Sequence, residues 1–386
     1  YHVNDKSILG YPEKSMKFPV KFHLSINDID INFERNIVYK FNDPVDGEVY
    51  QPFTILPEAT CSIKEKVIIF SDQKSKIVPV HILAGKDNIE GFITLNSPEG
   101  WVIKPQSHPF SVEKKGDQSI VYFEVTPPKE ISEGQLNPII QIGENTYDKE
   151  LHMLDYKYIP LQQVLMKSES KVVHLILQKK GENIGYIEGA GDAVPESLKQ
   201  IGYQVTRIKP AEITYDKLVK FDAIVMGIRA YNTVPELEFK QVELNRYIEN
   251  GGNLILQYNT SHRLITKDIA PFQIELSRDR VTDEFSEVSF LAPQHPILNY
   301  PNKISVNDFE NWVQERGLYF PNKWAKEFTP LLGMNDKNNK LTKGALLVAP
   351  YGKGYYIYTG ISFFRELPAG VPGAYRLFAN MLSIGK

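Results

Sequence analysis

Residues 183–192 read Asn-Ile-Gly-Tyr-Ile-Glu-Gly-Ala-Gly-Asp, a short apolar run that ends in a glycine-rich turn. The residues from Pro195 to Ile201 follow with helical character and begin with a proline, which a first helical turn tolerates. The stretch therefore predicts a β-strand over Asn183–Glu188 that turns tightly into a helix, with the glycines allowing the turn.

The same alternation of strand and helix continues along the second half of the chain. Strands are predicted at Tyr203–Ile208, Asp222–Gly227 and Asn253–Tyr258, and helices at Lys217–Lys220 and Pro235–Asn250. The apolar run Asp222–Gly227 is typical of a buried parallel strand. This spacing predicts an open α/β sheet with helices on both faces. After it come a predicted antiparallel hairpin, residues 345–360, and a closing helix, residues 374–384.

The first 180 residues have a different, mostly β pattern. Short apolar or alternating runs are separated by turn clusters; they are Val20–Leu24, Val67–Phe70, Ile77–Leu83, Gly91–Leu95 and Ile120–Val125. Strands and turns at this spacing predict a β-sandwich, which we place at residues 51–160. We expect residues 1–50 to be a β-rich segment that could be the tail of a preceding sandwich. Residues 161–182 are expected to be a linker or edge strand, and residues 183–386 the α/β domain.

Composition excludes several classes of function. The 386 residues carry 44 Lys and Arg against 47 Asp and Glu, and a net charge of -3 offers no basic field for nucleic acid. No apolar run approaches the roughly 18–20 residues that span a bilayer. The single cysteine, Cys61, excludes an intrachain disulfide, a multi-cysteine zinc site and a CxxC motif. The chain begins at Tyr1 with neither Met nor a signal peptide, so we expect a processed or truncated piece of a longer protein.

Polar side chains follow the predicted parallel strands, where ligands bind in open α/β sheets. They are Glu188 and Asp192, then Arg229, Tyr231 and Asn232, then Tyr258, Asn259, Thr260 and His262, and finally Arg278, Arg280, Asp279, Asp283 and Glu284 in a polar loop. We call this set the rim. Either these groups converge on a ligand pocket, or they cap helices and brace loops through mutual ion pairs.

The other motifs in the sequence give weaker indications of a catalytic, nucleotide or metal site. Gly189-Ala190-Gly191-Asp192 lacks the third glycine of a dinucleotide fingerprint and the Gly-Lys-Ser/Thr of a P-loop. Thr260 and Ser261 beside His262 have no identifiable orienting carboxylate, so turn residues are the simpler interpretation. The eight histidines show no HxxxH or HxH spacing, so no metal site is predicted. Aromatic clusters at Trp312, Tyr319-Phe320, Trp324 and Tyr355–Tyr358 are either core or stacking faces for a sugar.

Several stretches together resemble the C-terminal region of large bacterial PIG-L (LmbE-like) family deacetylases. They are residues 185–192, 227–233, 257–260, 276–284, 312–320 and 349–354, with residues 43–53 upstream. The resemblance implies that residues 51–160 form an Ig-like sandwich. It also implies an extracytoplasmic location, periplasmic or secreted.

The α/β half is also similar to ThuA-like and class I glutamine amidotransferase-like domains. Active amidotransferases use a cysteine at a strand-to-helix turn, but Cys61 lies outside this domain, so glutamine hydrolysis is not implied. The zinc-binding His-Pro-Asp-Asp motif of PIG-L enzymes is absent, since His108-Pro109 continues into Phe110 and His295-Pro296 into Ile297. The resemblance thus places this chain outside the catalytic domain, with zinc expected only in that domain and no cofactor in this chain.

The leading hypothesis is a non-catalytic accessory region of an N-acetyl sugar deacetylase, whose partners are its own N-terminal catalytic domain and a glycan. Arg229, Tyr231, Asn232, Tyr258, Asn259, His262, Arg280 and Asp283 are the candidate ligand-binding residues. The alternative is an independent sugar-binding or sugar-modifying α/β domain, with Glu188 and Asp192 as acid and base and Arg229 and Arg280 holding an anionic group. A third hypothesis is a structural protein whose rim only braces loops. Carboxylates and arginines that face a shared cavity favour a ligand, whereas mutual salt bridges favour bracing.

Overall fold

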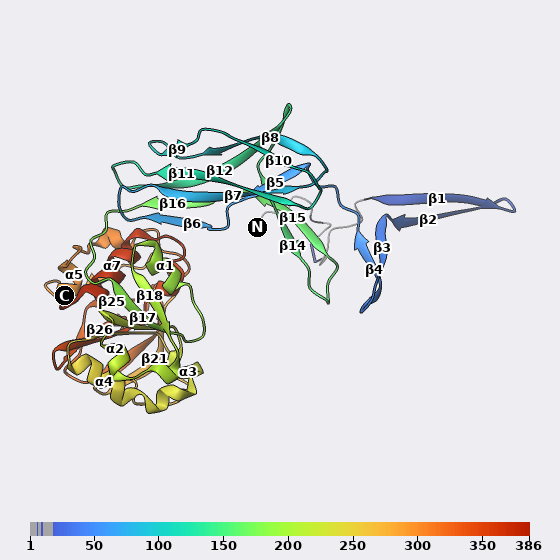
Figure 1. Cartoon of the computed structure of the whole chain (residues 1–386). Helices are drawn as coiled ribbons and strands as arrows, with labels where there is room; N and C mark the ends of the chain where they lie inside the picture. The colour runs from blue at the N-terminus through green and yellow to red at the C-terminus, as the bar shows by residue number, and fades with distance from the viewer. Residues whose placement is uncertain (1–5, 7–8, 11–17) are drawn as a thin grey trace.

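The computed structural model describes residues 6, 9, 10 and 18–386, so parts of the expected β-rich segment 1–50 lie outside the described residues. The protein is β-rich and has several sheets, arranged as N-terminal hairpins, a two-sheet sandwich and an α/β unit (Figure 1). Within the described part of the chain, no helix is both long enough and apolar enough to cross a membrane.

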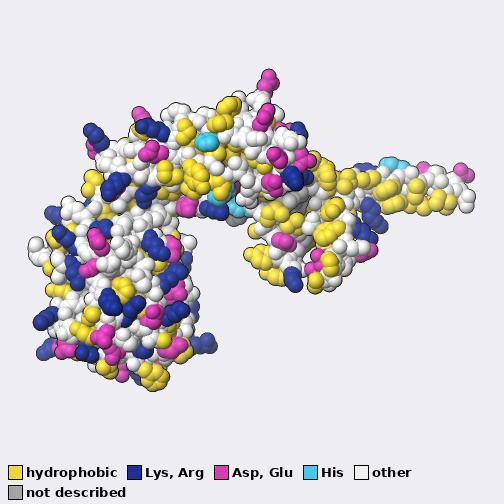
Figure 2. Space-filling model, viewed as in Figure 1, with side chains coloured by type: hydrophobic (Ala, Val, Ile, Leu, Met, Phe, Trp, Pro, Cys, Tyr) yellow, Lys and Arg dark blue, Asp and Glu magenta, His cyan; other side chains and the backbone are white. Residues whose placement is uncertain are grey.

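Two hairpins precede the sandwich: β1 (Pro19–Ile26) with β2 (Ile29–Asn36), and β3 (Val38–Asp43) with β4 (Gly47–Pro52). In the first hairpin, alternate residues are apolar and lie on one face. This apolar hairpin face comprises Val20, Phe22, Leu24, Ile26, Ile29, Ile31 and Phe33, all between 37% and 64% exposed. Figure 2 shows these hydrophobic side chains running along the projecting hairpin. Exposed apolar patches of this extent are uncommon on monomeric proteins.

The sandwich has one sheet in the order β10-β8-β12-β16-β6, with β13 beside β12, and a second in the order β5-β7-β11-β9. Its strands are β5 (Ala59–Ser62), β6 (Val67–Phe70), β7 (Lys76–Ala84), β8 (Ile89–Asn96), β9 (Val102–Lys104), β10 (His108–Val112), β11 (Gln118–Thr126), β12 (Ser132–Ile142), β13 (Asn145–Tyr147) and β16 (Ser170–His174). A separate hairpin joins β14 (Lys149–Leu154) to β15 (Gln162–Lys167). The expectation of a linker or edge strand at 161–182 is wrong for β16, which lies inside the sheet between β12 and β6 because its valines are buried.

The main sheet of the second half has the order β18-β17-β19-β20-β27-β26-β24. Its strands are β17 (Asn183–Ile187), β18 (Gln204–Ile208), β19 (Ala223–Met226), β20 (Asn253–Gln257), β24 (Thr329–Pro330), β26 (Leu346–Tyr351) and β27 (Gly354–Thr359). The first five strands in this order pair in parallel, and β26 pairs with β27 as an antiparallel hairpin. The predicted parallel strands and the predicted hairpin are therefore confirmed.

Helices cover both faces of this sheet, as the alternation of buried side chains requires. Ile184, Tyr186 and Val225 share one core with α1 (Val194–Gln200) and α7 (Pro372–Ser383). Ile224 and Met226 point to the other core, shared with α2 (Tyr215–Leu218) and α4 (Gln241–Glu249). Smaller elements are η2 (Pro210–Glu212), α3 (Ala230–Thr233), η3 (Pro235–Phe239), α5 (Pro296–Asn299), η4 (Val306–Phe309) and α6 (Phe363–Glu366).

The single helix predicted at Pro235–Asn250 is interrupted. A 3₁₀ turn, η3, ends before Lys240, and α4 begins after it. Leu237 is fully buried before the break, and Gln241 accepts a hydrogen bond from the Tyr231 hydroxyl at 2.6 Å after it. These tertiary contacts override the helical propensity of the sequence.

A small two-stranded ribbon, formed by β21 (Ile274–Val281) and β23 (Gly317–Trp324), is separate from the main sheet; we call it the side ribbon. Its two strands pair in antiparallel fashion, with register shifts between Glu275 and Arg280. A second short pair joins β22 (Val288–Phe290) and β25 (Leu332–Met334).

The sandwich packs directly against the α/β unit. The Gln200 side chain, at the end of α1, accepts a hydrogen bond from the Ile69 N–H at 2.8 Å and donates to the Val67 carbonyl at 3.2 Å. Lys76 donates to the Gln200 carbonyl at 2.9 Å. Ile69 and Val173 belong to the same core cluster as α1 and α7. The two units therefore share buried apolar contacts as well as hydrogen bonds.

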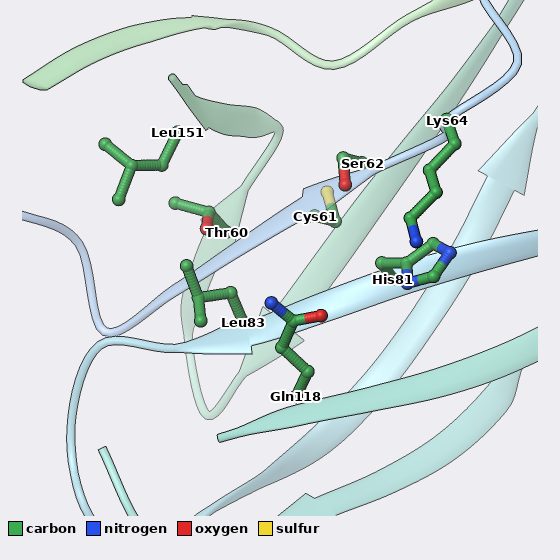
Figure 3. A pocket seen from close by; sticks show the side chains of 8 residues that line it. All are labelled: Thr60, Cys61, Ser62, Lys64, His81, Leu83, Gln118 and Leu151. Atoms are coloured by element: carbon green, nitrogen blue, oxygen red, sulfur yellow. The ribbon is translucent and has the colours of Figure 1, made fainter. Parts of the chain in front are cut away.

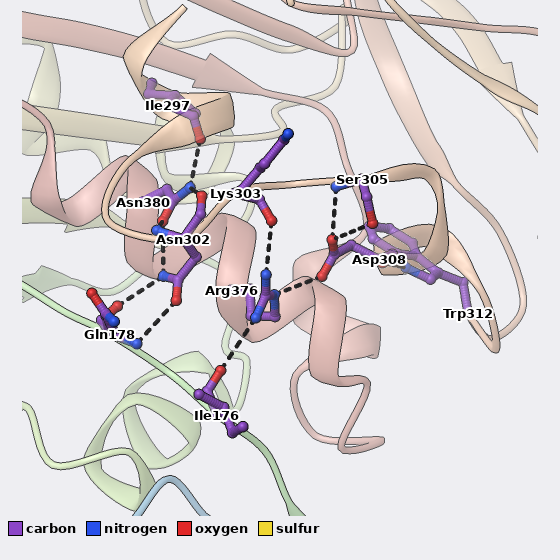
Figure 4. Close-up of polar contacts among 10 residues, drawn as sticks. All are labelled: Ile176, Gln178, Ile297, Asn302, Lys303, Ser305, Asp308, Trp312, Arg376 and Asn380. Carbon is purple, nitrogen blue, oxygen red and sulfur yellow. Dashed lines mark hydrogen bonds and ion pairs between the residues drawn. The ribbon is translucent and has the colours of Figure 1, made fainter. Parts of the chain in front are cut away.

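The segment that leaves the sandwich is also fixed to the α/β unit (Figure 4). Arg376 on α7 donates to the carbonyls of Ile176 and Lys303 and pairs with Asp308 at 2.8 Å. Beside it, the Asn302 side chain donates to the Gln178 carbonyl at 2.8 Å. The connection is anchored by these contacts to a helix and two loops.

Candidate functional site

The loops after β19 and β20 are joined to each other at the carboxyl end of the sheet. Arg229 N–H donates to the Tyr258 carbonyl at 2.7 Å, and Tyr231 N–H donates to the Asn259 side chain at 2.8 Å. The Asn232 amide donates to three carbonyls, those of Thr260, His262 and Arg263. Tyr231, Asn232 and Asn259 therefore brace the loops.

The two carboxylates predicted as acid and base both have structural partners. Glu188 pairs with Arg207 at 3.1 Å, and its side chain is exposed. Asp192 accepts from the Tyr186 hydroxyl at 2.6 Å and from the backbone N–H groups of Val194 at 3.0 Å and Ile228 at 3.2 Å. Burial, and then the charge and hydrogen bond of Asp192, raise the pKa of Tyr186 well above its usual value. These contacts fit the bracing interpretation for both residues.

Aromatic side chains gather at the same edge. The Tyr258 ring stacks on Tyr319 with centroids 6.1 Å apart and an interplanar angle of 9°, and lies 5.2 Å from Phe364. The His262 ring lies 6.3 Å from Tyr319. We call Tyr258, His262, Tyr319 and Phe364 the aromatic rim. His262 is exposed and Tyr319 and Phe364 are half-buried, so the cluster reaches the surface.

The strand-end rule predicts neither Phe364, on α6, nor Tyr319. Tyr319 comes from β23 in the side ribbon and reaches the rim where the register with β21 is irregular. Its φ is +54°, and Arg229, Arg263 and Gln314 around the rim also have positive φ. Non-glycine residues in this conformation are uncommon and cluster at functional sites. The only sequence feature that singles out Tyr319 is its place in an aromatic cluster.

Two arginines beside the aromatic rim, Arg229 and Arg280, form no ion pair among the described residues. The arginine ion pairs of those residues involve Arg207, Arg365 and Arg376. Arg280 is exposed, with its guanidinium carbon 5.9 Å from the Tyr319 ring centroid. Arg229 is exposed as well, and its charge acts on Tyr258, whose pKa is raised by burial and lowered in part by Arg229.

Two buried ionisable side chains, Arg316 and Glu366, are not among the predicted site residues. Arg316 is 4% exposed and donates to the carbonyls of Ser286 and Phe309. Glu366 is fully buried on α6 and accepts from the Val313 N–H at 3.0 Å. Burial raises the pKa of Glu366 to about 8.

Asp283 lies away from the aromatic contacts. Its carboxylate accepts from the Phe285 N–H at 2.9 Å, and its own N–H donates to Asp336. These contacts shape a loop, so the structure gives Asp283 no direct place beside the aromatic rim.

The sandwich contains a small cavity of about 150 Å³, lined in part by Cys61, His81 and Lys64 (Figure 3). Burial raises the pKa of the Cys61 thiol to about 12, which leaves it protonated and unreactive. Among the described residues, no group of three or more His, Cys, Asp or Glu side chains is placed to hold a metal ion.

No protein-family model and no curated protein matches the chain. Among solved structures, it is similar to an exo-β-1,4-mannosidase from Opitutaceae bacterium strain TAV5, at 11% identity and a TM-score of 0.32, covering 52% of this chain and 35% of that chain. It is also similar to a family 123 glycoside hydrolase from Clostridium perfringens, at 8% identity and a TM-score of 0.21, covering 53% and 38%. The chain thus spans little more than a third of either protein. At these TM-scores the likenesses carry no argument about function.

Proposed function

We propose that this chain is a non-catalytic region of a PIG-L-type N-acetyl sugar deacetylase and that its aromatic rim docks a glycan. One contrast carries the proposal. The two carboxylates predicted as acid and base, Glu188 and Asp192, have structural partners, whereas Tyr319, His262, Arg229 and Arg280 gather at the surface. Aromatic faces and guanidinium groups recognise sugars by stacking and by donating to hydroxyl or carboxylate oxygens.

The local chemistry is better suited to binding than to turnover. The Thr260 hydroxyl donates to the His262 carbonyl at 2.8 Å, so it is held by the backbone of the turn. Asp192 is held by a tyrosine hydroxyl and backbone amides. The alternative, in which Glu188 and Asp192 act as acid and base, would require both to leave these partners.

The rest of the proposal follows the family resemblance. The sandwich would be an Ig-like spacer, and the α/β unit an amidotransferase-like domain without a nucleophile. The contacts of Gln200 with Ile69 and Val67 would hold the spacer at a fixed angle to the aromatic rim. The parent enzyme would act outside the cytoplasm, with its zinc in a separate catalytic domain.

Calorimetric titration of the purified chain with N-acetylglucosamine oligomers tests the proposal. Tyr319→Ala and Arg229→Ala should each weaken binding about tenfold, because each removes one of the few surface groups of the site. Phe239→Ala is the matched control, since Phe239 is a 78% exposed aromatic on η3. Acetate release by the chain with added zinc would overturn the non-catalytic role, and equal affinity of Tyr319→Ala would overturn the aromatic rim as the docking site.

A further inference from the structure

A groove of about 640 Å³ lies between the side ribbon and the loop formed by residues 335–343. This volume is typical of ligand sites. The loop is tied to the ribbon through Asp336, which accepts from the N–H groups of Thr282 at 2.8 Å and Asp283 at 2.9 Å and from the Thr282 hydroxyl at 2.9 Å. The groove is therefore preformed.

Its walls carry an excess of positive charge. Arg278 and Arg280 enter from β21, and Lys340 and Lys343 from the loop; all four are exposed. The ion pairs of the described residues involve none of these four cations. The acidic residues of the lining are Asp279 and Asp336, and the Asp336 carboxylate is already occupied by Thr282 and Asp283.

The groove also has an aromatic surface and neutral hydrogen-bonding groups. Trp324, at the end of β23, is half-buried, packs against the α/β core and is one of the residues that line the groove. The side chains of Asn322, Asn339 and Thr342 stand beside it. An indole face with amides and hydroxyls suits the faces and hydroxyl groups of a sugar ring.

We propose that this groove binds an anionic oligosaccharide, with Trp324 stacking on a sugar ring and the lysines and arginines holding carboxylate or sulfate groups. Nucleic acid fits less well, because it requires a basic field over a longer surface than four cations in a chain of net charge -3 provide. Arg280 lies both in the groove and beside the aromatic rim, but no residue of the aromatic rim lines the groove, so this proposal does not depend on the proposed docking function.

Tryptophan fluorescence offers a direct readout of this groove. The chain has three tryptophans, and Trp101 and Trp312 are only 7% and 3% exposed, so Trp324 should report ligand binding. We would titrate the full chain with an oligogalacturonide, a sulfated heparin-derived oligosaccharide and a neutral cello-oligosaccharide. Binding of one or both acidic probes, weakening with salt, is the expected result, and the two acidic probes distinguish carboxylate from sulfate recognition. Equal binding of the neutral probe would overturn the proposal.

Variants separate this groove from its surroundings. The double substitution Lys340→Ala and Lys343→Ala should weaken binding of the acidic probe about tenfold. Lys337→Ala is the matched control, because Lys337 is exposed in the same loop and does not line the groove. His262→Ala should leave acidic-probe binding unchanged, because His262 belongs to the aromatic rim and does not line the groove, so failure of the aromatic rim and failure of the groove are distinguishable. An equal loss in Lys337→Ala would show a diffuse charge effect and reject the groove.

Discussion

Replacing Glu366 with glutamine is expected to remove a pH dependence from the stability of the protein. Glu366 is fully buried, and its Oε2 accepts from Val313 N–H at 3.0 Å. Its Oε1 has no hydrogen-bond partner among the described residues. Arg316 is nearby, but its guanidinium donates to backbone carbonyls. The carboxyl is therefore poorly solvated when charged, and burial raises its pKa to about 8.

The sign and size of the effect follow from proton linkage. The pKa of this group is 4.5 without the protein environment and about 8 in the folded chain. Between these values the folded chain keeps a proton that the unfolded chain has lost. The free energy of unfolding therefore falls as pH rises through this window and becomes level above pH 8. At about 1.36 kcal/mol per pH unit, the loss has a ceiling of about 5 kcal/mol.

Urea denaturation at pH values from 5 to 9 measures this dependence. The Glu366→Gln chain resembles the protonated form, so it should match the parent within about 1 kcal/mol at pH 5 and exceed it by several kcal/mol at pH 9. Glu310→Gln is the control, because Glu310 is an exposed carboxylate at the end of η4. Parallel stability curves for the parent and Glu366→Gln would refute the reasoning.

Three further outcomes are expected. Gly370→Ala should destabilise the chain by about 1–3 kcal/mol in calorimetry, because φ is +71° and the added Cβ would lie 2.7 Å from the Val67 side chain of the sandwich. Gly116→Ala is the control: its φ is +89° but the space around it is open, so its destabilisation measures the backbone strain alone. Leu24→Lys with Ile31→Glu should abolish most binding of a hydrophobic dye, since both lie on the apolar hairpin face; unchanged dye fluorescence would place the dye elsewhere. Cys61 should resist thiol reagents in the native chain at pH 8 and react on unfolding, because burial raises its pKa to about 12; rapid native labelling would contradict this.

The parallel sheet could be predicted because its signal is local. Each central strand is a short apolar run followed by a turn, and Ala223–Met226 is buried at every position. The interior place of β16 in the sandwich could not be predicted, because it depends on pairing with β12 and β6, which are far away in sequence. Hydrophobic runs indicate that a strand exists but leave its neighbours open.

In the candidate site, too, the sequence predicts the local features but not the contacts that depend on tertiary packing. The strand-end rule correctly brings the loops of Arg229 and Tyr258 together. It cannot show that Glu188 meets Arg207, because that pair depends on the neighbouring strand β18. It also cannot show that Asp192 folds back onto the Tyr186 hydroxyl of the strand it follows. Tyr319 escapes the rule altogether, since it arrives from the side ribbon through an irregular register.

The contacts of the charged side chains in the rim favour ligand binding over catalysis as their role. A hydrolase needs a carboxylate or imidazole that is free to move a proton at the reacting atom. Here both predicted carboxylates are held by structural contacts. His262 brings an exposed imidazole to the aromatic rim, but the Thr260 hydroxyl two residues before it already donates to a backbone carbonyl, and the other groups beside Tyr319 are guanidinium and aromatic side chains. Guanidinium groups stay charged and donate hydrogen bonds, so they bind and orient a ligand without exchanging protons with it. The same holds for the four cations of the groove. Under the proposed function, these two surfaces would hold a saccharide for chemistry that another domain would supply.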